Sequence, residues 1–284
     1  MALVKVSEIL KMADKANTSV IAFNCIDYSE VNAVCAVAEE LNKPVLIALY
    51  PGHCIDLKCN SPEAFAAMVI AEANNVQVPV GLHLDHCSDF NYIKRAIHAG
   101  FPSVMYDGSS LSIDENLRNT KEVVEYAHAR GVDVEAELGC VGFADNEQDQ
   151  SNVDMYTSPE TAKRFCEETG CDSIAVAIGS AHGFYTKTPK LDLERLSQIN
   201  AATDVPLVLH GGSGIPDDQL DKAFTMGVNK FNVGTEFLRM HYTAIEDFMQ
   251  KNNTNKRLLM QDIAIPAQEV LKEYLRKKML LTKM

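Results

Sequence analysis

Residues 79–86 read PVGLHLDH, a short apolar run that ends in an aspartate and a histidine. An apolar run of this length predicts a buried strand. A buried strand needs no titratable side chains for its packing, so Asp85 and His86 indicate chemistry at the end of the strand.

Seven further runs are similar in length and character, at 19–24, 44–50, 103–108, 133–139, 173–179, 206–212 and 230–235. Segments with helical apolar spacing lie between them, for example 116–131 and 158–170. Strands too apolar to leave either face in water, alternating with helices, predict a parallel sheet covered by helices.

Eight such units predict an α/β fold of the (β/α)8 TIM-barrel type. An open doubly wound sheet is the alternative, but its dinucleotide fingerprint GxGxxG is missing after the first strand, which ends AFNCIDYSE. We therefore expect residues 1–284 to form a single barrel domain, with a C-terminal helical extension over about 240–284.

The composition limits the possible partners. The 284 residues carry a formal net charge of -13, whereas nucleic acids and anionic membranes require clustered Lys and Arg. No apolar run approaches the roughly 20 residues of a membrane span, and the N-terminal segment reads as an amphipathic helix rather than a signal peptide. The eight cysteines form no CxxC pair. These features predict a cytoplasmic protein with reduced thiols.

Three histidines follow different strands of the expected barrel. His86, His182 and His210 come after strands three, six and seven, at the rim where active sites of this fold lie. Three imidazoles that leave coordination positions open suit a catalytic Zn²⁺. Any one of these histidines alone is more often a hydrogen-bonded core or surface residue, which is our interpretation of His83.

Asp85 is expected at the metal without binding it. The carboxyl group either transfers a proton or orients a histidine ligand. Burial raises the pKa of such a group toward the working pH, and a nearby cation opposes the rise.

Small residues follow the last two strands, in HGGSG at 210–214 and NVGT at 232–235. Phosphate sites of these barrels commonly lie at this position. Glycines allow backbone N–H groups to converge on an anion without obstruction by side chains. The sequence therefore predicts an anion site here in spite of the acidic net charge.

The motifs AFN, HLDH, SVMYDGS, VEAELG, DSIAVAIGSAHGFY, PLVLHGGSG and NVGTE occur in this order over about residues 20–240. Together they resemble the class II, metal-dependent ketose-bisphosphate aldolases, which act on fructose 1,6-bisphosphate or tagatose 1,6-bisphosphate. The resemblance implies reversible cleavage to dihydroxyacetone phosphate and glyceraldehyde 3-phosphate through a zinc-stabilised enediolate. It also implies a homodimer or homotetramer.

The resemblance assigns roles residue by residue. It implies Zn²⁺ bound by His86, His182 and His210, with Glu137 nearby as an alternate ligand or a support, and Asp85 as general acid/base. It places substrate contacts at Asn24, Gly183, Gly211, Gly212, Ser213, Asn232, Val233, Gly234 and Thr235. A monovalent cation, Na⁺ or K⁺, is a second candidate cofactor.

Some positions depart from the family pattern. The acidic segment 140–157 is long for a βα loop and reads as a lid, with Asp145 or Glu147 where the family carries a proton-transferring glutamate. Tyr50 replaces a small hydroxyl residue. Three alternatives therefore stay open: an aldolase for another phosphorylated ketose or sugar acid, a metal-dependent barrel hydrolase, and a non-catalytic zinc-binding regulatory subunit.

Overall fold

The eight expected strands form one closed parallel barrel. The computed structural model describes residues 3–55, 61–139, 141–142, 144, 155–252 and 257–284. Within them the strands pair in sequence order from β1 to β8, and β8 pairs with β1. The barrel prediction is confirmed. The strands are β1 Val20–Asn24, β2 Val45–Leu49, β3 Val80–Cys87, β4 Ser103–Tyr106, β5 Asp133–Leu138, β6 Ser173–Val176, β7 Leu207–Leu209 and β8 Val228–Val233.

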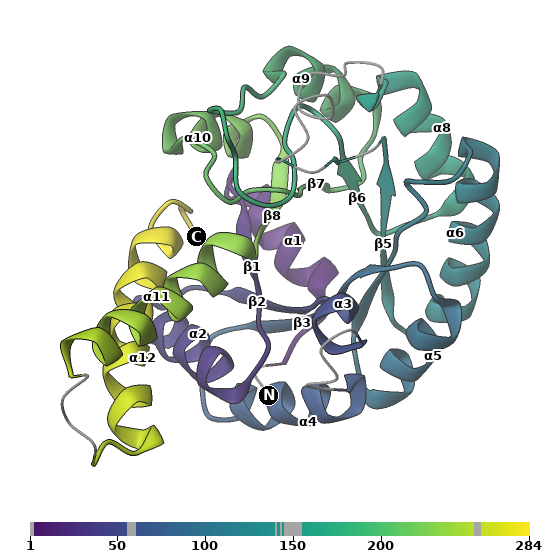
Figure 1. The fold of residues 1–284 in the computed structure, drawn as a ribbon. Helices are drawn as coiled ribbons and strands as arrows, with labels where there is room; N and C mark the ends of the chain where they lie inside the picture. The colour runs from purple at the N-terminus through teal and green to yellow at the C-terminus, as the bar shows by residue number, and fades with distance from the viewer. Residues whose placement is uncertain (1–2, 56–60, 140, 143, 145–154, 253–256) are drawn as a thin grey trace.

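Helices surround the barrel on the outside (Figure 1). Side-chain caps explain several of their beginnings: Ser158 Oγ accepts a hydrogen bond from the backbone of Thr161 at the start of α8, and Gly170 ends this helix in the left-handed conformation. The helices are α1 Val6–Lys15, α2 Tyr28–Leu41, α3 Pro51–Ile55, α4 Pro62–Ala73, α5 Phe90–Ala99, α6 Ile113–His128, α8 Pro159–Thr169, α9 Leu193–Ala202, α10 Asp217–Thr225, α11 Thr235–Lys251 and α12 Met260–Met279.

The N-terminal end of the barrel is closed by α1. Val6, Ile9 and Leu10 of this amphipathic helix pack on Val20 and Leu46 of the first two strands. The backbone of Ser7 also donates a hydrogen bond of 2.8 Å to the Asp133 carboxylate at the start of β5. Only the C-terminal rim of the barrel is therefore left for a site.

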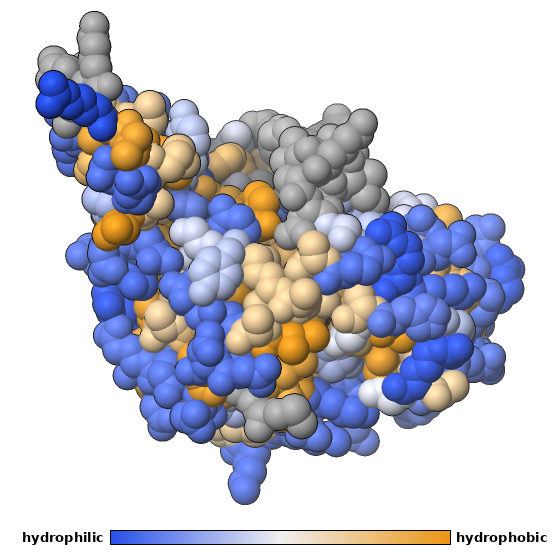
Figure 2. Space-filling model, turned by 90° about the horizontal axis from the view of Figure 1, so that it is seen from below, coloured by the Kyte–Doolittle hydropathy of each residue, from blue (hydrophilic) through white to orange (hydrophobic). Residues whose placement is uncertain are grey.

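The C-terminal segment is helical and contains α11 and α12. Helix α11 begins at Thr235, directly after β8, and completes the eighth strand–helix unit. Only α12 lies beyond the barrel units, and it packs on α11 and α2. The projecting end of this pair carries apolar side chains, coloured orange at the upper left of Figure 2. Met249, Leu259, Met260 and Ile265 are exposed on these two helices or next to them.

Among the described residues, no helix is both long and apolar enough to span a membrane.

Candidate metal centre and active site

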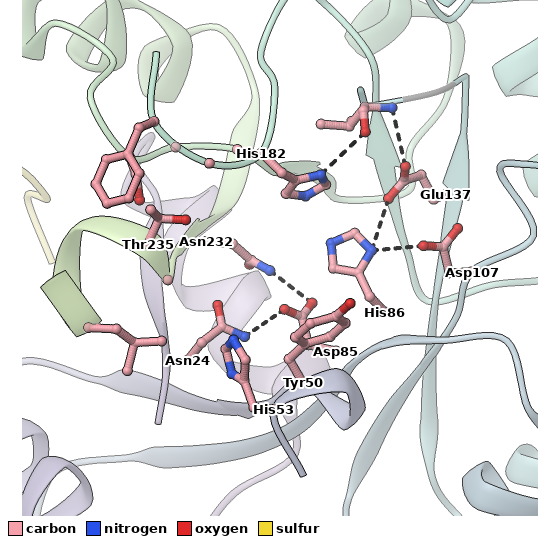
Figure 3. Close-up of a pocket in the computed structure, with 18 of the residues that line it drawn as sticks. Asn24, Tyr50, His53, Asp85, His86, Asp107, Glu137, His182, Asn232 and Thr235 are labelled. Atoms are coloured by element: carbon pink, nitrogen blue, oxygen red, sulfur yellow. Dashed lines mark hydrogen bonds and ion pairs between the residues drawn. The ribbon is translucent and has the colours of Figure 1, made fainter. Parts of the chain in front are cut away.

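A cavity of about 750 Å³ opens at the C-terminal rim of the barrel, and Figure 3 shows side chains from several strands pointing into it. Most of the residues predicted for the site line this cavity, namely Asn24, Asp85, His86, Glu137, His182, Gly183, Gly211, Gly212, Ser213, Asn232, Gly234 and Thr235. His210 lies fully buried below them. Val233 is buried in β8 and is not among the lining residues. Asp145 and Glu147 lie outside the described residues.

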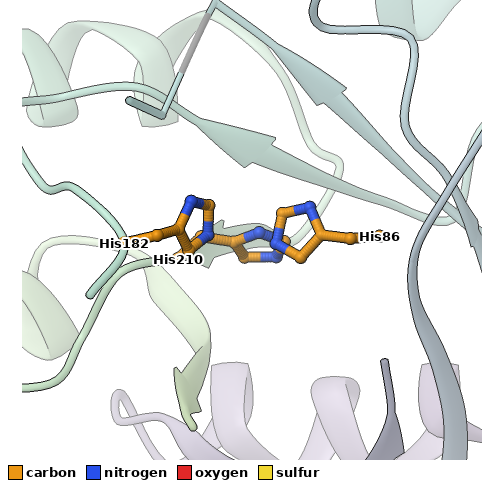
Figure 4. Close-up of side chains that lie close together, drawn as sticks. All are labelled: His86, His182 and His210. Atoms are coloured by element: carbon orange, nitrogen blue, oxygen red, sulfur yellow. The ribbon is translucent and has the colours of Figure 1, made fainter. Parts of the chain in front are cut away.

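The three predicted histidines meet at the base of the cavity (Figure 4). Their ring centroids are 4.4 Å apart for His86 and His210, 4.7 Å for His86 and His182, and 6.0 Å for His182 and His210. One nitrogen of each ring lies within 4.8 Å of one nitrogen of each of the others. This spacing is compatible with three imidazoles sharing a single ion.

A second interaction orients each ring. His86 Nδ1 lies 2.8 Å from Asp107 Oδ2, and His182 Nδ1 lies 3.3 Å from the carbonyl oxygen of Val141. His210 Nε2 lies 2.9 Å from Glu135 Oε1. These partners leave Nε2 of His86, Nε2 of His182 and Nδ1 of His210 to face one another, as metal-bound histidines require.

Two buried polar atoms test whether a cation fits this centre. His210 Nδ1 and Glu137 Oε2 are both buried without a hydrogen bond, and they lie 3.3 Å apart. If His210 donates Nε2–H to Glu135, the Nδ1 lone pair faces a carboxylate oxygen, and this contact is repulsive unless a proton or a metal ion lies at Nδ1. The residues therefore fit a divalent cation.

Burial and neighbouring charges shift the pKa values of these rings in different directions. Burial lowers the pKa of His182 to about 3, which keeps the ring neutral as a ligand must be. Burial also disfavours charge on His210, but the hydrogen bond with Glu135 and the negative charges of Glu137 and Asp85 outweigh burial and raise its pKa to about 10.

Asp85 and His86 are neighbours in the chain, yet both line the cavity. Successive strand residues normally point to opposite faces. Here the register of β3 against β4 shifts between Leu84 and Cys87, and His86 takes a φ of 44°. Such a bulge re-aims side chains and is sustained at functional sites despite its strain.

Two amides hold the carboxylate of Asp85 in place. Asn24 Nδ2 donates to Oδ2 at 2.7 Å, and Asn232 Nδ2 donates to Oδ1 at 2.9 Å. Burial by itself raises the pKa of Asp85, but the charges of His86, His210 and Lys230 outweigh burial and hold this pKa below its usual range. The expectation of a raised pKa is therefore wrong, because these positive charges surround the carboxyl group.

The glycine-rich segment after β7 packs closely against the segment after β6. A Cβ on Gly211 would lie 2.4 Å from the carbonyl oxygen of Ala181, and Gly211 has a φ of 65°. The Tyr185 hydroxyl joins the two segments, accepting from Ala181 N at 2.6 Å and donating to the Gly211 carbonyl at 2.8 Å. Ser213 Oγ accepts from the backbone of Glu236 at 3.0 Å, which ties this segment to the start of α11.

Lys230 requires a correction. The predicted run 230–235 put Lys230 at the start of the last strand. In the structure β8 begins at Val228, and Lys230 is fully buried with Nζ 2.9 and 2.8 Å from the two oxygens of Glu135. His83, in the same buried layer, forms a 2.8 Å hydrogen bond with Ser103 Oγ, so its interpretation as a core residue is confirmed.

The sequence reasoning missed several residues of the site. Glu135 precedes Glu137 by two positions on β5, so strand alternation placed both on the inner face and could have identified Glu135. Asp107 lies near the end of the predicted strand 103–108, but the sequence did not identify it as the partner of His86. His53 and Arg239 line the cavity from α3 and α11, and no strand pattern predicted them.

The fold and the site define a TIM-barrel protein with three clustered histidines that could share a metal ion, in a pocket at the C-terminal rim of the barrel. Residues 4–283 match the family model described as class II fructose-bisphosphate aldolase, so the chain belongs to this family. The resemblance read from the sequence is thereby confirmed, and aldol cleavage is favoured over hydrolysis.

Solved structures agree with this membership. The chain is 33% identical to the YdjI aldolase from Escherichia coli K12, with a TM-score of 0.86 over 98% of this chain and 97% of that chain. It is 24% identical to the fructose-bisphosphate aldolase (Fba) from Campylobacter jejuni, with a TM-score of 0.83 over 99% of this chain and 94% of that chain. The second likeness concerns the fold alone.

Proposed function

We propose that the protein is a zinc-dependent aldolase that reversibly cleaves fructose 1,6-bisphosphate or tagatose 1,6-bisphosphate to dihydroxyacetone phosphate and glyceraldehyde 3-phosphate. The observation that carries the proposal is the meeting of His86, His182 and His210 beside Asp85 in one cavity of about 750 Å³. A cavity of this size accommodates a small sugar phosphate.

His86, His182 and His210 would hold the metal, with Glu137 as an alternate ligand. When bound, Zn²⁺ supplies Lewis-acid stabilisation of the negative charge that develops on the substrate when the C3–C4 bond breaks. Asp107 and Glu135 orient two of the ligand rings through the hydrogen bonds described above.

Asp85 would take the proton of the C4 hydroxyl during cleavage and return it during condensation. The surrounding positive charges lower its pKa and keep the carboxylate ionised, as a general base must be before it accepts a proton. Asn24 and Asn232 hold both carboxylate oxygens, so they fix the direction in which the carboxylate meets the substrate.

The phosphate of dihydroxyacetone phosphate would lie against Gly183, Gly211 to Ser213 and the segment from Asn232 to Thr235. Small residues at these positions leave backbone N–H groups accessible to an anion. A monovalent cation, Na⁺ or K⁺, would add charge at this phosphate.

The proton on the dihydroxyacetone phosphate carbon would be exchanged by Asp145 or Glu147 of the lid segment. We further propose a cytoplasmic homodimer or homotetramer. The apolar residues exposed near the projecting end of α11 and α12 support association, because contiguous apolar surface is typical of interfaces.

The direct test is release of dihydroxyacetone phosphate from each of the two bisphosphates, with and without a chelator and after zinc is restored. Cleavage that the chelator stops and zinc restores is expected, and the ratio of the two rates identifies the sugar. Protein that carries zinc but cleaves neither sugar would contradict the proposal and favour another phosphorylated ketose, a sugar acid or a regulatory role.

A further inference from the structure

Arg239 lies where two cavities adjoin. The main cavity and a neighbouring cavity of about 410 Å³ share Gly183, Phe184, Ser213 and Arg239 among their lining residues. Gly183 and Ser213 belong to the proposed phosphate site. Among the described residues that line the main cavity, Arg239 is the only lysine or arginine.

The guanidinium of Arg239 has no carboxylate partner within the described part of the chain. Three other arginines, Arg95, Arg195 and Arg276, each pair with a carboxylate at 2.8 to 3.1 Å in this protein of net charge -13. The nearest acidic residue before it on α11 is Glu236, whose Oε2 lies 3.0 Å from Lys278 Nζ of α12. Lys278 therefore already neutralises Glu236, and the charge of Arg239 remains available to bind another anion.

The position of Arg239 on α11 directs it toward the phosphate site. It follows Thr235 by four residues, about one helical turn, so both residues lie on the same side of the helix. The guanidinium carbon lies 4.8 Å from the centroid of the Tyr242 ring, a contact that supports the side chain while leaving its N–H groups to other partners.

We propose that Arg239 binds the phosphate group of the substrate. Its guanidinium donates hydrogen bonds to the phosphate, and the other donors of the proposed phosphate site are neutral. This inference rests on the proposed function and adds to it a residue that recognises the phosphate. Arginine suits this task because its planar fork matches two phosphate oxygens and its charge persists at every working pH. Local positive charge also offsets the repulsion of an anion by an acidic protein.

The test measures binding of inorganic phosphate to the zinc-loaded protein by titration calorimetry at several salt concentrations. Arg239→Gln removes the charge and is expected to weaken phosphate binding about tenfold, the effect of losing one exposed charge-assisted hydrogen bond. Arg239→Lys is expected to restore part of the affinity, because it restores the charge without the fork. The dependence of affinity on salt should also decrease in Arg239→Gln.

Arg130→Gln is the matched control. Arg130 is likewise exposed and its guanidinium lies 3.6 Å from the centroid of the Tyr126 ring, but it lines neither cavity. Its removal should leave phosphate affinity unchanged. Kinetic measurements add a second readout: Arg239→Gln should raise KM for the cleaved bisphosphate more than it lowers kcat, because the phosphate is unchanged in the transition state.

Equal phosphate affinity of Arg239→Gln and the unaltered protein would overturn the inference, and so would an absence of phosphate binding by the unaltered protein. Phosphate binding requires no turnover, so the role of Arg239 and the proposed function can be contradicted independently of each other. Weakened binding in a protein that cleaves neither bisphosphate would support the role of Arg239 and contradict the proposed function.

Discussion

Glu135 and Lys230 form an ion pair in the interior of the barrel, with Nζ 2.9 Å from Oε1 and 2.8 Å from Oε2. Both side chains are completely buried. The same Oε1 lies 2.9 Å from His210 Nε2. Burial raises the pKa of Glu135, but Lys230, His83 and His210 outweigh burial and lower it. Lys230 therefore keeps an anion beside His210, a proposed metal ligand, which makes Lys230 a positioning residue in that proposal.

Lys230→Met should reduce the free energy of unfolding by about 3–5 kcal/mol, because it leaves a buried carboxylate without its partner. Chemical denaturation at pH 7 measures this change. Lys272→Met, which breaks the solvent-exposed pair with Glu269, should change stability by less than about 0.5 kcal/mol. The double variant Lys230→Met/Glu135→Gln should recover part of the loss. If the double variant lost as much stability as Lys230→Met alone, packing and not charge would account for the loss.

Asp85→Ala should keep the metal and lose most of the turnover, since the carboxylate is proposed to transfer a proton and not to bind zinc. A loss of about 10²- to 10⁴-fold in kcat is expected for removal of a general base. Metal content by elemental analysis, measured together with kcat, distinguishes this outcome from a damaged metal centre. Near-normal turnover in Asp85→Ala would refute the proton-transfer role.

His210→Ala should lose both metal and activity, because it removes one of three ring nitrogens that face a common point. The matched control is His128→Ala, which removes an exposed histidine that pairs with Asp172 at 2.8 Å, far from the cavity residues. Zinc content after dialysis is the measurement. Full zinc occupancy in His210→Ala would mean that this ring is not a ligand.

Alanine substitutions at two glycines of the proposed phosphate site distinguish the cost of backbone strain from the cost of a steric clash. Gly183 and Gly211 both have positive φ, but a Cβ on Gly183 meets nothing within 4 Å, whereas a Cβ on Gly211 meets the Ala181 backbone at 2.4 Å. Gly183→Ala should lose about 1 kcal/mol of stability from conformation alone. Gly211→Ala should lose clearly more stability and should raise KM, because the segments after β6 and β7 must move apart to admit the added Cβ. Thermal unfolding and kinetics measure both effects. Similar losses in the two variants would exclude the steric explanation.

The sequence predicted the barrel and the meeting of three histidines because both follow from regular patterns. Each strand is a short apolar run, and His86, His182 and His210 lie at or just after the ends of such runs, so strand ends alone brought them to one rim. The sequence could not predict how the neighbours Asp85 and His86 both face the cavity, because this depends on the β3 bulge and on the φ of His86.

Residues on helices were harder to predict. Arg239 enters the cavity from the second turn of α11, and His53 enters it from the short helix α3. Neither position follows from strand periodicity. Lys230 was misplaced because the start of β8 was predicted two residues too late, and this error moved a central interior residue to the edge of the barrel.

The contact between His241 of α11 and Glu30 of α2 predicts how stability depends on pH. His241 Nδ1 lies 2.9 Å from Glu30 Oε1, and this hydrogen bond raises the pKa of His241 against the opposing effect of burial. Because the folded protein binds the proton more tightly than the unfolded chain, the contribution is fully present below about pH 6.5, the unperturbed value. It is lost as the pH rises through the higher pKa of the folded state.

His241→Gln should therefore be less stable than the unaltered protein at pH 6, by about 1 kcal/mol for a partly buried charge-assisted hydrogen bond. The difference should shrink as the pH rises to 9. Urea denaturation of both proteins across this range measures it, and taking the difference cancels the titration of the other histidines they share. A difference that grows with pH would contradict the raised pKa and would mean that neutral His241 is the form that stabilises the contact between α11 and α2.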